Sequence, residues 1–105
     1  PNEMLKYLAL DFMNKFYLIV ERYYNEEISE EFKFESYKLF QTILQSEEKI
    51  IENERYIIYL SAGIIYYYII KMNLENINIK EITNLFHIKS KFILEYYEII
   101  SKLKI

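Results

Sequence analysis

The stretch RYIIYLSAGIIYYYIIKM, from Arg55 to Met72, decides the fold, because its apolar residues surround the whole circumference of a helix. A helix that is apolar on every side is buried among other helices. Ser61, Ala62 and Gly63 form a patch of small residues within it, and glycine in a helix costs roughly 1 kcal/mol relative to alanine. Gly63 is therefore predicted to mark the place where another helix crosses closely.

The same stretch has no charge from Tyr56 to Ile70 and could be mistaken for a membrane span. A span requires roughly 18 or more apolar residues, and this run is shorter. Arg55 and Lys71 close it on either side. The run is predicted to be a central third helix of a folded core, and no membrane partner is expected.

Four further helices are predicted around it from apolar residues spaced by three and four positions. They cover residues 3–24, 34–48, 79–86 and 90–102, and the segment from Asn25 to Glu31 is predicted to be a connection. The residues expected to face inward are Leu5, Leu8, Phe12, Phe16, Ile19, Val20 and Tyr23 in the first; Tyr37, Phe40, Ile43 and Leu44 in the second; Ile79, Ile82, Leu85 and Phe86 in the fourth; and Ile93, Tyr96 or Tyr97, Ile100 and Leu103 in the fifth.

Composition agrees with one all-α domain over residues 1–105. The chain is 52% hydrophobic, which is too apolar for a disordered chain, and it has one glycine and one proline, too few for the turns of a β-sandwich or barrel. Cysteine is absent, so disulfides and thiolate zinc sites are excluded. No signal peptide is recognised. The location expected is intracellular, in the cytoplasm of a prokaryote or in a nucleus.

The last third has the pattern of a helix-turn-helix, over about residues 78–103. Asn78 followed by Glu81 fits a capping box at the start of the fourth helix. His87-Ile88-Lys89 is the predicted turn, with Ile88 anchoring it to the core. Asn73 and Asn76 are predicted to end the third helix and link it to the fourth.

Several of these segments resemble the cyclin-type repeat of transcription factor IIB and its archaeal relative, transcription factor B. The matching residues are Ser61-Ala62-Gly63 through Tyr66, then Asn78-Ile79-Lys80-Glu81-Ile82, then Ile88, Ile93 and Tyr97. The resemblance implies a five-helix cyclin-like domain that contacts promoter DNA, TATA-binding protein or RNA polymerase. This chain departs from the family where the DNA-reading repeat exposes threonine and arginine, because Phe92, Leu94 and Glu95 stand there. His87 stands where the family often has glycine.

The distribution of charge gives evidence both for and against DNA binding. The net charge is −3, whereas a phosphate-binding module normally has a basic face. From Asn78 onward, however, five lysines stand against three glutamates, a balance of about +2. The candidate DNA contacts are Lys80, Lys89, Ser90, Lys91 and Lys102, together with Lys104 at the end of the chain. The alternative is that these lysines belong to an ordinary solvated helix surface and contact no DNA. Residues that read base edges are scarce, so strong sequence selectivity is not expected.

No catalytic residues, cofactor or metal site are predicted, and the chain is not expected to be an enzyme. His87 is the only histidine, and a metal there would need carboxylates alone as its other ligands. The acidic pairs Glu26-Glu27, Glu30-Glu31 and Glu47-Glu48 are expected in linkers, where they would serve solubility or a basic partner. Acid–base catalysis instead requires sheltered carboxyls. One glycine cannot form a phosphate-binding loop.

Adjacent tyrosines are the remaining candidates. Neighbours in a helix diverge by about 100°, so Tyr23-Tyr24, Tyr66-Tyr67-Tyr68 and Tyr96-Tyr97 cannot all face inward. Tyrosine is enriched at protein interfaces, and Tyr23, Tyr24, Tyr67 and Tyr68 are the candidate interface residues. The alternative is that these tyrosines lie in the core or on an ordinary surface.

Three functions follow as expectations. The first is a transcription-related cyclin-type module that docks on DNA-bound factors or polymerase, with weak DNA contact. The second is a protein-only interaction domain that keeps the fold. The third is a homodimeric helix-turn-helix regulator, whose recognition helices would sit about 34 Å apart.

Overall fold

The computed structural model describes residues 2–24, 26–46 and 54–103, and all regular structure in these ranges is helical. The helices are α1 (Asn2–Tyr23), α2 (Glu30–Ser46), α3 (Glu54–Lys71), α4 (Ile79–Phe86) and α5 (Ser90–Lys102). The predicted all-α class is confirmed, and α4 and α5 have the predicted bounds.

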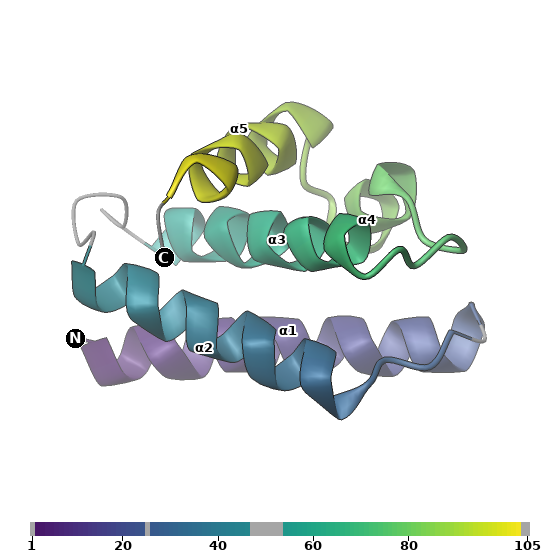
Figure 1. Cartoon of the computed structure of the whole chain (residues 1–105), viewed down its shortest axis with the longest axis horizontal. Helices are drawn as coiled ribbons and strands as arrows, with labels where there is room; N and C mark the ends of the chain where they lie inside the picture. Colours follow the sequence, from purple (N-terminus) through teal and green to yellow (C-terminus); the bar gives the residue numbers. More distant parts are fainter. Residues whose placement is uncertain (1, 25, 47–53, 104–105) are drawn as a thin grey trace.

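Helix α3 lies between two layers of helices (Figure 1). Helices α1 and α2 run along one of its sides, and α5 packs on the other, with α4 beside it. Its most extensive contacts are with α5, followed by α1 and then α2. The central position predicted from its uniformly apolar sequence is therefore found, because each of its faces has a helix to pack against.

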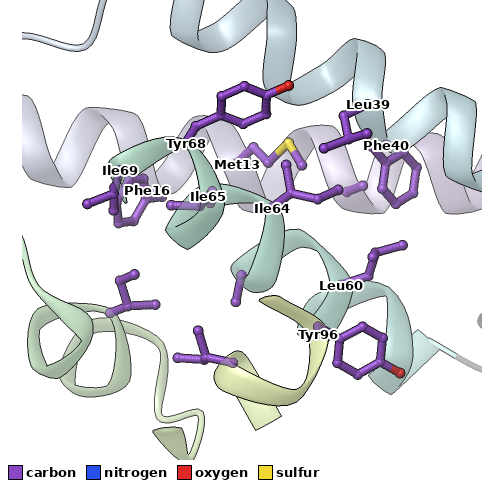
Figure 2. Close-up of a cluster of buried hydrophobic side chains, with 14 of the residues drawn as sticks. Met13, Phe16, Leu39, Phe40, Leu60, Ile64, Ile65, Tyr68, Ile69 and Tyr96 are labelled. Carbon is purple, nitrogen blue, oxygen red and sulfur yellow. The ribbon is translucent and has the colours of Figure 1, made fainter. Parts of the chain in front are cut away.

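Side chains from four helices meet in the core around α3 (Figure 2). Met13 and Phe16 come from α1, and Phe40 from α2; all three are almost completely buried. Tyr96 of α5 approaches α3 from the opposite side. The largest fully buried side chains of α3 are Ile57, Leu60, Ile64, Ile65 and Ile69.

Gly63 marks the crossing of α3 and α5, as predicted. A Cβ atom at Gly63 would lie 2.6 Å from the Cβ of Tyr96 and 3.2 Å from the Tyr96 carbonyl carbon. Such distances are far inside van der Waals contact, so only glycine lets the two backbones approach this closely.

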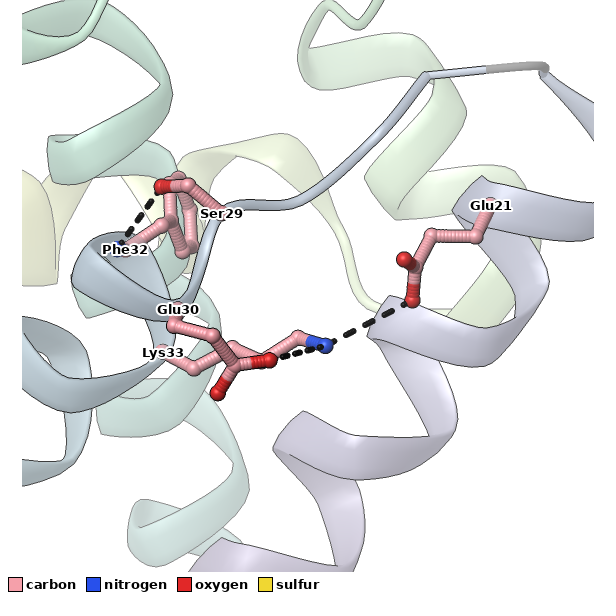
Figure 3. A network of polar contacts seen from close by, with 5 residues as sticks. All are labelled: Glu21, Ser29, Glu30, Phe32 and Lys33. Atoms are coloured by element: carbon pink, nitrogen blue, oxygen red, sulfur yellow. Dashed lines mark hydrogen bonds and ion pairs between the residues drawn. The ribbon is translucent and has the colours of Figure 1, made fainter.

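Helix α2 begins earlier than the predicted residue 34, and this part of the prediction is wrong. Ser29 is its N-cap: the Ser29 Oγ accepts a hydrogen bond from the Phe32 N–H at 3.1 Å (Figure 3). Glu30 and Glu31 form the first turn, where negative charge interacts favourably with the helix dipole. Apolar periodicity missed this turn because a capped, acidic first turn has few apolar residues. The predicted end at Glu48 lies outside the described residues, as does Asn25.

One inward-facing prediction is also wrong. Tyr23, the last residue of α1, is 72% exposed. Tyr37 is half-buried, and the buried side of α2 also includes Phe32 and Leu39. Lys33 links the two helices, with its Nζ 3.7 Å from carboxylate oxygens of both Glu21 in α1 and Glu30 in α2 (Figure 3).

Asn73 ends α3 as predicted. Its φ of 56° is left-handed, a conformation that asparagine adopts more readily than most residues. The Leu74 N–H donates to the Ile69 carbonyl at 3.0 Å, and the Asn73 N–H donates to the Ile70 carbonyl at 3.2 Å. This pair of bonds is a Schellman motif, which satisfies carbonyls that the helix end would leave free.

Candidate nucleic-acid and protein contact surfaces

The start of α4 is fixed by its cap. The Asn78 Oδ1 accepts a hydrogen bond from the Lys80 N–H at 2.8 Å, and the Glu81 carboxylate accepts one from the Asn78 N–H at 3.1 Å. The capping box predicted from the sequence is therefore present. It engages the Glu81 carboxylate in a local bond and leaves the neighbouring Lys80 exposed in the first turn.

Three residues connect α4 to α5. His87 has a φ of 55° and a ψ of 40°, in the left-handed region. Ile88 is buried and anchors the connection to the core, as predicted. Lys89 is the extended N-cap of α5. The strained turn and the buried isoleucine together set the direction in which α5 leaves α4.

The first turn of α5 is the most basic part of the α4–α5 unit. Lys89, Ser90 and Lys91 are all exposed. This turn has no acidic residue, and no side chain caps the helix N-terminus. Free N–H groups and the positive end of the helix dipole attract anions, and two lysines stand beside them. The Lys91 Nζ lies 5.0 Å from the centre of the Phe92 ring.

Further along α5, the positive charge is interrupted. Lys91, Glu95, Glu98 and Lys102 are exposed and recur at three- and four-residue spacing, so they share one face of the helix. Beyond the first turn this face therefore has two glutamates and one lysine, a net negative charge. Lys102 lies at the far end of this helix from Lys89, and Lys80 lies at the end of α4 away from the connection. Lys104 is outside the described residues.

The five candidate DNA contacts therefore form one compact group and two outliers. Lys89, Ser90 and Lys91 lie together, whereas Lys80 and Lys102 are each at a remote helix end. Phosphates on a duplex recur at short intervals, so a compact basic group can contact one strand segment. A continuous basic stripe along α5 is not present in the described chain.

Phe92 and Leu94, which depart from the family pattern, lie in different environments. The Phe92 ring stacks on Tyr59 of α3, with ring centres 4.6 Å apart and planes 3° from parallel. Phe92 is therefore partly a packing residue between α5 and α3. Leu94 is an exposed large hydrophobic residue on the surface of α5, where it could contact a partner.

The four candidate interface tyrosines also differ in how far they are exposed. Tyr23 is exposed, and Tyr24 and Tyr67 are half-buried. Tyr68 is only 6% exposed and packs edge-on against Phe32 of α2. Its ring belongs to the core, because it lies on the side of α3 that α2 covers, and it offers almost no surface to a partner. Burial, followed by the charge of Glu35 and then Tyr67, raises the pKa of Tyr68.

Two surface hollows are found among the described residues, and neither was predicted from the sequence. One, of about 300 Å³, lies between α2, α3 and the end of α5, and Tyr67 and Lys71 line it. The Lys71 Nζ is 5.7 Å from the Tyr67 ring centre. The other, of about 270 Å³, lies between α1 and α2 and includes Leu10 and Phe34.

The acidic pairs lie apart from these hollows or at their rims. Glu26 accepts a hydrogen bond from the Asn76 side chain at 2.7 Å, which ties the α1–α2 connection to the α3–α4 connection. Glu30 is at the rim of the second hollow. Glu47-Glu48 is outside the described residues. Across residues 2–24, 26–46 and 54–103, no three histidine or carboxylate side chains gather closely enough to bind a metal.

Helix α3, which could be mistaken for a span, is enclosed by other helices. In the described part of the chain, no helix combines the length and the apolarity that crossing a bilayer requires. Comparisons with protein-family models, with curated proteins and with solved structures return no match for this chain.

Proposed function

We propose that this chain is a non-enzymatic, transcription-related docking module whose α4–α5 unit acts as a helix-turn-helix and makes weak contacts with the DNA backbone. The observation that carries the proposal is the exposed group Lys89, Ser90 and Lys91 at an uncapped helix N-terminus with no acidic residue in its first turn. Two lysines and free N–H groups suit phosphate oxygens.

The outer face of α5 also limits how the module would contact DNA. Glu95 and Glu98 lie on the outer face of α5, where they would repel phosphates beyond the first turn. Backbone contact without base reading is therefore the proposed mode, and a partner protein such as TATA-binding protein or RNA polymerase would supply promoter specificity. These two partners come from the resemblance to the transcription factor IIB repeat.

Fluorescence anisotropy with a labelled mixed-sequence duplex, at low and moderate salt, tests the proposal. Wild-type protein is expected to bind at low salt and to lose affinity steeply as salt rises, because phosphate contacts release counterions. Lys89→Glu/Lys91→Glu should abolish this binding. Lys38→Glu/Lys71→Glu is the matched control, since it changes the net charge equally at exposed lysines of α2 and α3.

Equal loss of binding in both double variants would assign the effect to overall charge and would reject the α5 site. No wild-type binding at low salt would reject DNA contact and favour the second candidate, a protein-only interaction domain. Glu95 and Glu98 on the outer face of α5 favour that candidate, because they would repel phosphates. A pull-down that compares wild type with Leu94→Glu would then test α5 as its docking surface.

A further inference from the structure

Helix α1 has a second face, opposite the core, that is lined by large apolar side chains. We call it the outer α1 face. Met4, Tyr7 and Leu18 are 68%, 70% and 68% exposed. Isolated exposed apolar residues are ordinary, but these lie along one stripe of a single helix. The outer α1 face consists of the exposed residues Met4, Tyr7, Asp11, Asn14, Lys15, Leu18, Glu21 and Arg22.

The spacing along this stripe is that of a helix-pairing seam. Met4, Asp11 and Leu18 are seven residues apart, and Tyr7, Asn14 and Glu21 repeat the same interval. A seven-residue repeat with alternating three- and four-residue steps keeps one line of side chains facing a partner helix. The apolar members are at the ends of the stripe, and its middle is polar.

The middle of the stripe also determines which orientation a partner helix could take. Asp11 and Lys15 form an ion pair of 3.0 Å one turn apart. In a parallel pair of α1 helices, Asp11 would lie against Asp11 and Lys15 against Lys15, which is unfavourable. In an antiparallel pair centred near residues 12 and 13, Asp11 lies opposite Asn14 of the second copy and beside its Lys15.

The antiparallel arrangement also brings apolar residues together. In the register that places Asp11 opposite Asn14, a two-fold axis places each Tyr7 against Leu18 of the other copy and each Met4 opposite its Glu21. At a rise of about 1.5 Å per residue, the two Tyr7–Leu18 contacts lie about 16 Å apart along α1. The patch is thus complementary to itself in apolar contact at Tyr7 and Leu18 and in charge at Asp11 and Lys15, as a two-fold interface requires.

We infer that this chain forms an antiparallel homodimer through the outer α1 face, with a second copy of the chain as the occupant. Helix α3 separates α1 from α5 (Figure 1). The dimer therefore leaves the first turn of α5 free on the distal side of each copy. It does not bring the two α5 helices together on one face of a duplex.

Sedimentation velocity of the full chain, without DNA and over rising protein concentration, tests this inference. Wild type is expected to shift from monomer to dimer. Tyr7→Lys and Leu18→Glu should each weaken the dimer by about tenfold or more, because each buries a charge against an apolar side chain. The combined variant should recover most of the affinity, since each introduced ammonium then faces an introduced carboxylate. Leu94→Lys, at an exposed leucine of α5, should leave the dimer unchanged.

These variants separate the inference from its rivals. In a parallel dimer the combined variant would place like charges together, so a failure to recover overturns the antiparallel pairing. A wild type that stays monomeric, or a dimer that Tyr7→Lys and Leu18→Glu leave intact, overturns the interface itself. Circular dichroism checks folding, which should be preserved because both residues are exposed. Leu18→Ser tests the same contact should a charged variant lose helicity.

Discussion

Tyr17 is a polar residue in the core between α1 and α2. Its hydroxyl and that of Ser36 are both buried, and neither has a hydrogen-bond partner among the described residues. Burial raises the pKa of Tyr17 to about 12. A buried hydroxyl without a partner has a desolvation cost that a phenylalanine would avoid.

This environment predicts a specific pH dependence for folding. The pKa of Tyr17 is higher in the folded chain than the ordinary value of 10.0. Its contribution to stability is therefore complete below pH 10 and is lost as the pH rises toward 12. Relative to Tyr17→Phe, the wild type should lose about 2–3 kcal/mol of unfolding free energy over that window. Urea unfolding at several pH values measures this difference.

At neutral pH, Tyr17→Phe should raise the unfolding free energy by about 1 kcal/mol or more, because it removes a buried hydroxyl that has no hydrogen-bond partner. Tyr7→Phe is the control, since Tyr7 is exposed and its variant should follow the wild type at every pH. If the unfolding free energies of the wild type and of Tyr17→Phe changed in parallel with pH, the Tyr17 hydroxyl would reach water in the folded state.

At the scale of single elements, the crossing of α3 and α5 depends on Gly63. Helix packing distances are set by the side chains at the contact. At this contact α3 contributes a glycine, which has no side chain. The α-carbon of Gly63 faces both the Tyr96 side chain and the backbone between Tyr96 and Tyr97. Because backbone cannot move aside as a flexible side chain can, an added methyl group must push the two helices apart.

Gly63→Ala should therefore destabilise the fold, although alanine favours helix by roughly 1 kcal/mol. Overpacking costs about 1–3 kcal/mol, and the contact with backbone atoms places Gly63 in the upper half of that range. This leaves a net loss of about 1–2 kcal/mol in urea unfolding. Ser61→Ala is the control on the same helix: it removes only a hydroxyl that bonds the Ile57 carbonyl at 2.8 Å, and it should change stability by less than 1 kcal/mol. A Gly63→Ala variant as stable as wild type would contradict the close crossing.

At the scale of the whole molecule, α3 is the helix on which the others depend. It contacts α5, α1 and α2 extensively, whereas α4 is short and has only Ile82 fully buried. Local opening requires breaking the contacts of the segment that opens. The contacts of α3 cannot be broken without unfolding most of the chain.

Native-state hydrogen exchange should therefore be slowest in α3, from Leu60 to Ile69, where amides open only with global unfolding. The amides of α4 should exchange faster and should respond less to low concentrations of denaturant. If the amides of α1 or α2 were more protected than those of α3, the core would not be organised around α3. The most stable unit would then be the α1–α2 pair.

Much of this organisation could be predicted from the sequence, where local chemistry determines local structure. The capping box at Asn78, the helix end at Asn73 and the bounds of α4 and α5 all depend on residues within a few positions of one another. The burial of α3 follows from its composition. The start of α2 was missed because Ser29 and two glutamates have no apolar period, although serine before acidic residues is itself a helix-start pattern.

The sequence by itself determined the helical class, most helix ends and the need for a close approach at Gly63, because backbone hydrogen bonding, capping and steric size act locally. The tertiary structure alone decided which tyrosines are available to a partner: Tyr23 and Tyr68 have the same chemistry, but α2 covers one of them and nothing covers the other. It also decided that the Phe92 ring of α5 stacks on Tyr59 of α3. Exposure and proximity are properties of packing, which joins segments far apart in the chain.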